Sequence, residues 1–94
     1  MYDVNRISLL YADGTRGALS NICHGNGTNK WASVIDLKDA VEDSMCADHL
    51  VRNLAALHLI GFMSPALSRD TDEYTRVKGT DSLGNVKYIQ AWKK

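Results

Sequence analysis

Two apolar patterns of helical period lie close together in the middle of the chain. The apolar residues of the first pattern are Val34, Leu37, Ala40 and Val41. Those of the second are Ala47, Leu50, Val51, Leu54 and Leu57. A spacing of three and four residues puts apolar side chains on one side of an α-helix. The sequence therefore predicts two amphipathic helices joined by a tight turn, which is a helix-turn-helix.

Short polar residues and a glycine mark the ends of these helices. Ser33 stands just before the first pattern, and Asp36 follows three residues later, as in a capping box. The first helix is therefore expected over residues 34–42. Asp43 and Ser44 break that helix and offer an N-cap for the second one. Gly61 is expected to end the second helix in a left-handed conformation.

The chain beyond Gly61 has the character of turns and strands. Residues 62–73, "FMSPALSRDTDE", contain the only proline and a polar cluster, which predicts a loop. The β-rich runs "YTRVK" and "VKYIQAW" flank "GTDSLGN", whose residues favour a turn. A β-hairpin is therefore expected over residues 74–92.

The N-terminal residues 1–24 allow two interpretations. Apolar residues at helical spacing, in "VNRISLLY" and "TRGALSNIC", favour helices. The dipeptide Asp13-Gly14 instead favours a hairpin between "RISLLYA" and "TRGALS". Because Leu9-Leu10 breaks the strict alternation of a strand, helices are the favoured prediction.

Length and composition indicate one globular domain. The chain has 94 residues, of which 45% are hydrophobic, and a net charge of zero. No apolar run approaches the ~20 residues of a membrane span, and the N-terminus lacks the features of a secretory signal. We therefore expect a cytoplasmic protein, and a reduced state for Cys23 and Cys46.

The charges are unevenly distributed. Residues 30–48 hold five acidic and two basic residues, whereas residues 50–94 hold seven basic and four acidic ones. The C-terminal half is therefore the candidate for contact with an anion, although a solvated surface gives the same count.

The chain resembles the winged helix-turn-helix DNA-binding domains of bacterial and phage transcription regulators. The residues that carry the likeness are Leu37, Val41, Leu50, Leu54, Leu57, Gly61, Phe62 and Met63, followed by the hairpin. The stretch "LVRNLAALHLIGFM" matches the family's second helix at each apolar step. The N-terminal "LLYADGTRGALSNI" is also similar to the first-helix region of arsenic-sensor-type repressors. The turn "EDSMCADH" is about two residues longer than is usual in the family.

The resemblance implies an α+β fold, a winged helix-turn-helix with a three-helix core and a C-terminal β-hairpin wing. One domain would fill residues 1–94. Its parts would be a helical or hairpin segment over 1–24, which also offers a dimer contact, the helix-turn-helix over 31–63 and the wing over 74–92.

An outward face of the second helix is the candidate DNA-contacting surface. With the leucines turned inward, the residues expected to meet base edges are Asp48, His49, Arg52 and Asn53. Arginine pairs well with guanine and asparagine with adenine, whereas phosphates repel Asp48. The wing is expected to contact phosphate or the minor groove through Arg76, Lys78 and Lys87. A solvated helix face and gatekeeper lysines on an exposed strand are the alternatives.

We therefore predict a sequence-specific regulator of transcription that binds double-stranded DNA as a homodimer and needs no cofactor. The main alternative is a winged helix that binds a protein partner, as a phage-type inhibitor or adaptor, which the zero net charge and Asp48 favour. A metal site at Cys46 and His49 with Cys23 and His24 is not predicted, because free cysteines are mostly buried. No catalytic arrangement can be assembled, so an enzyme is not expected.

Overall fold

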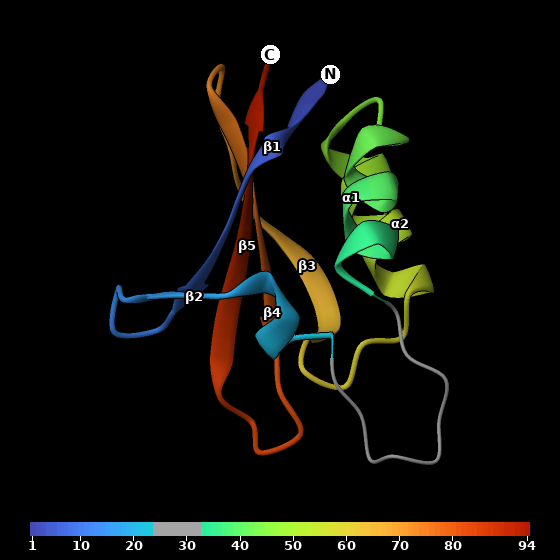
Figure 1. Cartoon of the computed structure of the whole chain (residues 1–94). Coiled ribbons are helices and arrows are strands. Elements are labelled where there is room, and N and C mark those ends of the chain that lie inside the picture. The colour runs from blue at the N-terminus through green and yellow to red at the C-terminus, as the bar shows by residue number, and fades with distance from the viewer. Residues whose placement is uncertain (24–32) are drawn as a thin grey trace.

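One antiparallel sheet and two helices form the protein. The computed structural model describes residues 1–23 and 33–94. Within these residues the strands are β1 (Tyr2–Tyr11), β2 (Arg16–Gly17), β3 (Met63–Asp70), β4 (Tyr74–Thr80) and β5 (Val86–Lys93). The helices are the 3-10 helix η1 (Leu19–Asn21), α1 (Val34–Glu42) and α2 (Ala47–Ala56). The strands lie in the order β2-β1-β5-β4-β3, and α1 and α2 lie together on one face of the sheet (Figure 1).

The winged helix-turn-helix prediction is wrong. That fold has a three-helix core with a hairpin at its side, whereas the described residues form two α-helices against a five-stranded antiparallel sheet. The predicted hairpin exists as β4 and β5, but β5 also pairs with β1 along its other edge. The hairpin is therefore the centre of the sheet and not a wing.

The hairpin lies at the centre of the sheet because the N-terminal segment forms strands and not the predicted helices. The favoured prediction of helices is wrong for residues 1–23 apart from the three-residue η1, and the hairpin alternative is confirmed, with Leu9 opposite Gly17 and Leu10 opposite Arg16. Gly14 has a φ of +86°, which glycine adopts without steric cost. The Asp13 carboxylate accepts hydrogen bonds from the backbone N–H and the hydroxyl of Thr15, which closes the turn.

Residues 62–73 were expected to form a loop, and this prediction is wrong because most of them belong to β3. The strand is at the edge of the sheet, and its register with β4 shifts between Met63 and Ala66. Pro65 falls within this irregular part. An edge strand tolerates proline because one of its sides has no ladder to complete.

The first helix is confirmed over residues 34–42, with the expected capping box between Ser33 and Asp36. The predicted ends of the second helix are wrong. Its N-cap is Cys46, because Ser44 is buried and its hydroxyl donates to the carbonyl oxygen of Ala40 at 2.7 Å. At the other end, His58 takes the left-handed conformation with a φ of 52°.

Gly61 has a packing role in place of the predicted capping role. It is buried, and a Cβ atom added there would lie 2.7 Å from the Cα atom of Ile22. The loop after α2 can therefore approach the backbone just after η1 only because residue 61 has no side chain.

The hydrophobic core lies between the helices and one face of the sheet. The fully or nearly fully buried side chains from the helices are Leu37, Val41, Leu50 and Leu54, and those from the sheet include Leu9, Val77, Ile89 and Ala91. The predicted apolar sides of both helices are thus confirmed as core-forming. None of the helices in residues 1–23 and 33–94 has the length and apolar character to cross a membrane.

Candidate functional site

One of the four residues predicted to meet base edges on the second helix, Asn53, is engaged within the helix pair. Asp48 and Arg52 are exposed on α2, and His49 is half-buried. The side-chain amide of Asn53 donates to the Ala40 carbonyl oxygen at 3.3 Å and to the Ser44 hydroxyl oxygen at 3.0 Å. Asn53 therefore fastens α2 to the end of α1.

The residues predicted on the wing are separated by the sheet. Arg76 and Lys78 alternate along β4 with the buried Val77, so they point away from the helices. Lys87 is buried on the helix side of β5, where its Nζ atom lies 3.6 Å from an oxygen of Asp81. The structure therefore does not combine helix and wing residues into one surface.

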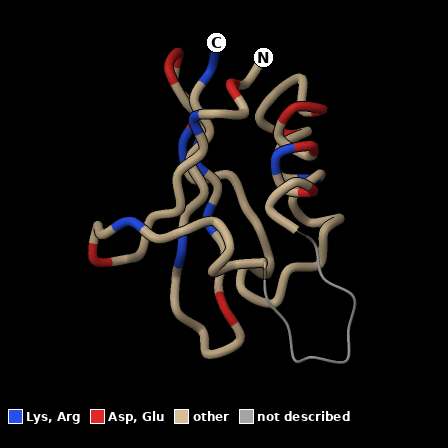
Figure 2. Tube along the Cα trace, viewed as in Figure 1, with Lys and Arg blue, Asp and Glu red and all other residues tan. Residues whose placement is uncertain are grey.

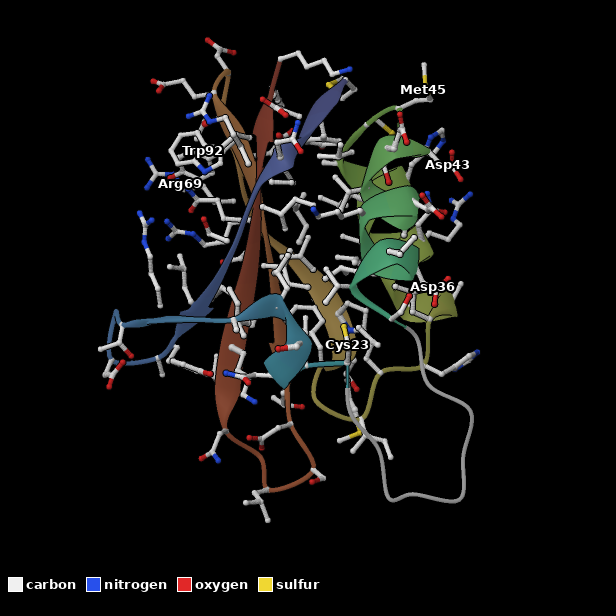
Figure 3. The ribbon with its side chains drawn as sticks, viewed as in Figure 1. Cys23, Asp36, Asp43, Met45, Arg69 and Trp92 are labelled. Carbon is white, nitrogen blue, oxygen red and sulfur yellow. The ribbon has the colours of Figure 1, made fainter. Side chains whose placement is uncertain are left out.

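The sheet has a second face that the described helices do not cover. We call it the open face, and it consists of the strand positions that point away from α1 and α2. Figure 3 shows Trp92 and Arg69 on this face, whereas Asp36, Asp43 and Met45 lie on the side of the helices. In β4 and β5 it carries three consecutive cross-strand pairs, which are Tyr74 with Trp92, Arg76 with Gln90 and Lys78 with Tyr88.

Arg76 is held at the centre of the open face. Its Nε and Nη2 atoms donate to the side-chain oxygen of Gln90 at 2.9 and 2.7 Å. The central carbon of its guanidinium group lies 5.3 Å from the ring centre of Tyr74 and 6.0 Å from that of Tyr88. These distances allow cation–π contacts with both tyrosines. The guanidinium group is therefore oriented before any ligand binds.

Trp92 also has a ring and a guanidinium group as neighbours. Its ring centre lies 5.1 Å from that of Tyr74, at an interplanar angle of 63°. The guanidinium carbon of Arg6 lies 4.9 Å from the centre of the Trp92 ring. The three aromatic side chains of the open face remain only half-buried, so part of each ring is accessible.

The open face carries basic residues, and none of their cross-strand partners is acidic. Its basic residues are Arg6, Arg16, Arg69, Arg76 and Lys78. Within the described residues, the two salt bridges join Asp81 to Lys87 and Asp70 to Lys93, so none of these five is paired with a carboxylate.

The acidic residues lie elsewhere in the described chain. Those in or next to α1 and α2 are Asp36, Asp39, Glu42, Asp43 and Asp48. Those in turns between strands are Asp13, Asp72, Glu73 and Asp81. Asp70 accepts from the buried Thr75, and Asp3 lies in the irregular start of β1. Figure 2 shows this separation, with the acidic residues mainly on the helices and loop tips.

The metal site considered from the sequence has no support in the part of the chain that the structure describes. Cys23 and Cys46 are free thiols, and burial raises the pKa of Cys23. Within residues 1–23 and 33–94, no three metal-ligating side chains lie together. His24 lies outside the described residues.

Comparisons with protein-family models, curated proteins and solved structures gave no match to this chain.

Sequence reasoning identified only part of the open face. It singled out Arg76 and Lys78, but missed the aromatic residues beside them and the arginines of β1, β2 and β3. The signal was the period of two in "YTRVK" and "YIQAW", where large polar or aromatic residues alternate with smaller, mostly apolar ones. Arg6 and Arg69 carried no local signal, because their strands were predicted as a helix and a loop.

Proposed function

We propose that this protein binds single-stranded nucleic acid on the open face of its sheet. The observation that carries the proposal is the interleaving of three half-buried aromatic rings with five basic side chains on the open face, which the described helices leave uncovered. Aromatic rings stack on unpaired bases, while lysine and arginine attract the phosphates between them. Both kinds of contact are available on the same surface.

The electrostatic arrangement also favours an anionic partner. Arg69 and Arg76 lie directly opposite each other on β3 and β4. Like charges at such positions destabilise a sheet, and an anion between them would relieve the repulsion. Gln90, a neutral residue, orients Arg76 without cancelling its charge.

The dimensions favour a single strand over a duplex. Five strands at a spacing of about 4.8 Å give a face ~19 Å wide, broader than the ~12 Å major groove of DNA. A sheet lying on its face therefore cannot enter that groove. A four-stranded RNA-binding sheet stacks about two or three bases, and the open face has three rings for such contacts.

Duplex binding by a transcription regulator and a homodimer contact through residues 1–24 remain predictions. The described residues do not form the winged fold that implied them, and Asn53 is engaged within the helix pair. A protein partner also remains a prediction. A duplex of the same sequence is therefore included in the test below.

The test is a titration of fluorescently labelled strands followed by anisotropy. Oligonucleotides of about 12 nucleotides, as RNA and as DNA, suit the site sizes of such proteins. We expect binding to single strands at low salt and weaker binding to the duplex. Tyr88→Thr should weaken single-strand binding by about 5- to 150-fold, since each base stack contributes ~1–3 kcal/mol.

The control is Ile35→Thr, which also replaces a large side chain by threonine, but at an exposed position on α1. It should leave the affinity unchanged. A Trp31→Phe background leaves Trp92 as the single tryptophan, so quenching of its emission reports stacking on the open face. The proposal is overturned if no single strand binds at low salt, or if Tyr88→Thr and Ile35→Thr have equal effects.

A further inference from the structure

A pocket of about 310 Å³ lies at the edge of the open face beside β1 and β2. Its lining consists of Asn5, Arg6, Ile7, Ser8, Arg16 and Trp92. This volume is at the lower end of the range for pockets that bind small ligands. Two arginines from different strands and one aromatic ring thus surround the same space.

The pocket exists because β2 is short. It pairs with β1 only at Leu9 and Leu10, so the described residues provide no strand partner for the outer edge of β1 at residues 5–8. Backbone groups on an unpaired strand edge can bind a ligand directly.

The two arginines of the pocket have capacity for an anion. Both side chains are exposed, and neither forms an ion pair within residues 1–23 and 33–94. Each guanidinium group presents a fork of N–H donors that matches the oxygens of a phosphate. The Ser8 hydroxyl adds a further donor at the same site.

We infer that this pocket binds the terminal phosphate of the nucleic-acid strand on the open face. The inference rests on the proposed function, because the strand brings the phosphate to the pocket. A strand that crosses the sheet from Arg69 on β3 reaches the opposite edge at this point. A terminal phosphate monoester carries a charge of about −1.5 to −2 at neutral pH and exposes three oxygens, so it suits two guanidinium groups better than a diester does.

The experiment compares unlabelled strands that compete with a labelled strand of the same sequence. The competitors carry a 5′-phosphate, a 3′-phosphate or hydroxyl groups at both ends. We expect one phosphorylated strand to compete about tenfold better than the hydroxyl-ended strand. Arg16→Gln should reduce this preference to near unity.

The control is Arg69→Gln at the other edge of the sheet, which removes the same charge from the open face. It should weaken binding of all competitors and preserve the preference for the terminal phosphate. Equal competition by all three strands with the unchanged protein would overturn the inference while single-strand binding stands. A preference that persists in Arg16→Gln would also overturn it, since the phosphate would then bind elsewhere.

If no strand binds, the proposed function fails and the pocket is tested separately with adenosine 5′-monophosphate. Backbone amide shifts of Ser8 and Arg16 in NMR spectra would then support a phosphate site at the pocket. Their absence at saturating nucleotide would overturn it.

Discussion

Replacing Arg69 and Lys78 with glutamine should reduce the salt dependence of single-strand binding. Both side chains are exposed on the open face and, among the described residues, unpaired with any acid. Binding of a basic protein to a nucleic acid releases counterions from the phosphates that it neutralises. The salt dependence therefore counts the basic residues that reach phosphate.

The magnitude follows from the five basic residues of the open face. If each neutralises one phosphate, the slope of log K against log salt is about −3.5 for a single strand. Raising the salt from about 50 to about 200 mM should then weaken binding roughly 130-fold. With Arg69 and Lys78 replaced, the slope falls to about −2.1 and the loss to roughly 18-fold.

The assay is anisotropy at four or more salt concentrations, with Arg52→Gln as the control. Arg52 carries the same charge and is exposed, but it lies on α2 behind the sheet. Its replacement should leave the slope unchanged. A slope that is equal in the double variant and the unchanged protein, or one that falls in Arg52→Gln, would refute the assignment of the strand to the open face.

Three further predictions concern the scaffold. Gly61→Ala should lower the free energy of unfolding by about 1–3 kcal/mol in urea titrations, since its Cβ would meet the Ile22 backbone at 2.7 Å; a smaller loss would show that the loop moves freely. Asn53→Ala should cost about 1–2 kcal/mol in the same measurement and leave strand affinity intact, because its amide binds within the helix pair; a large loss of affinity would instead restore the helix as the contact surface. Hydrogen bonds from Lys93 and a neighbouring threonine hold the pKa of Asp70 below its usual range. A depressed carboxyl pKa stabilises the fold above the unfolded value and loses this effect as the pH falls through the folded value. Asp70→Asn should therefore lower the melting temperature at pH 7, and the deficit should shrink as the pH falls below about 3.9, the ordinary value of an aspartate carboxyl. A deficit that does not change with pH would contradict this reasoning.

Patterns within short stretches predicted several local features correctly. The Ser33 and Asp36 capping box and the hairpin of residues 74–92 depend on neighbours within a few positions, and both are confirmed. The apolar spacing around Leu50 and Leu54 likewise identified buried residues. These features needed no knowledge of which distant segments meet.

The segments on either side of these elements were predicted wrongly because their structure depends on distant partners. Leu9 and Leu10 break the alternation of polar and apolar residues, yet they belong to a strand because Ile89 and Tyr88 lie opposite them. Residues 63–70 form a strand only by pairing with β4. Neither partner is visible from local periodicity.

The sequence by itself determined two amphipathic helices, the capping box of the first one and a C-terminal hairpin, because these arise from contacts between near neighbours in the chain. Only the tertiary structure decided that the hairpin is the centre of a sheet and that the helices cover one face. Strand pairing brings Arg6, Arg69 and Trp92 onto the other face, although they are far apart in sequence. Successive side chains of a strand point to opposite faces of the sheet. The packing of the helices on one face therefore also determined which side chains stay accessible on the other.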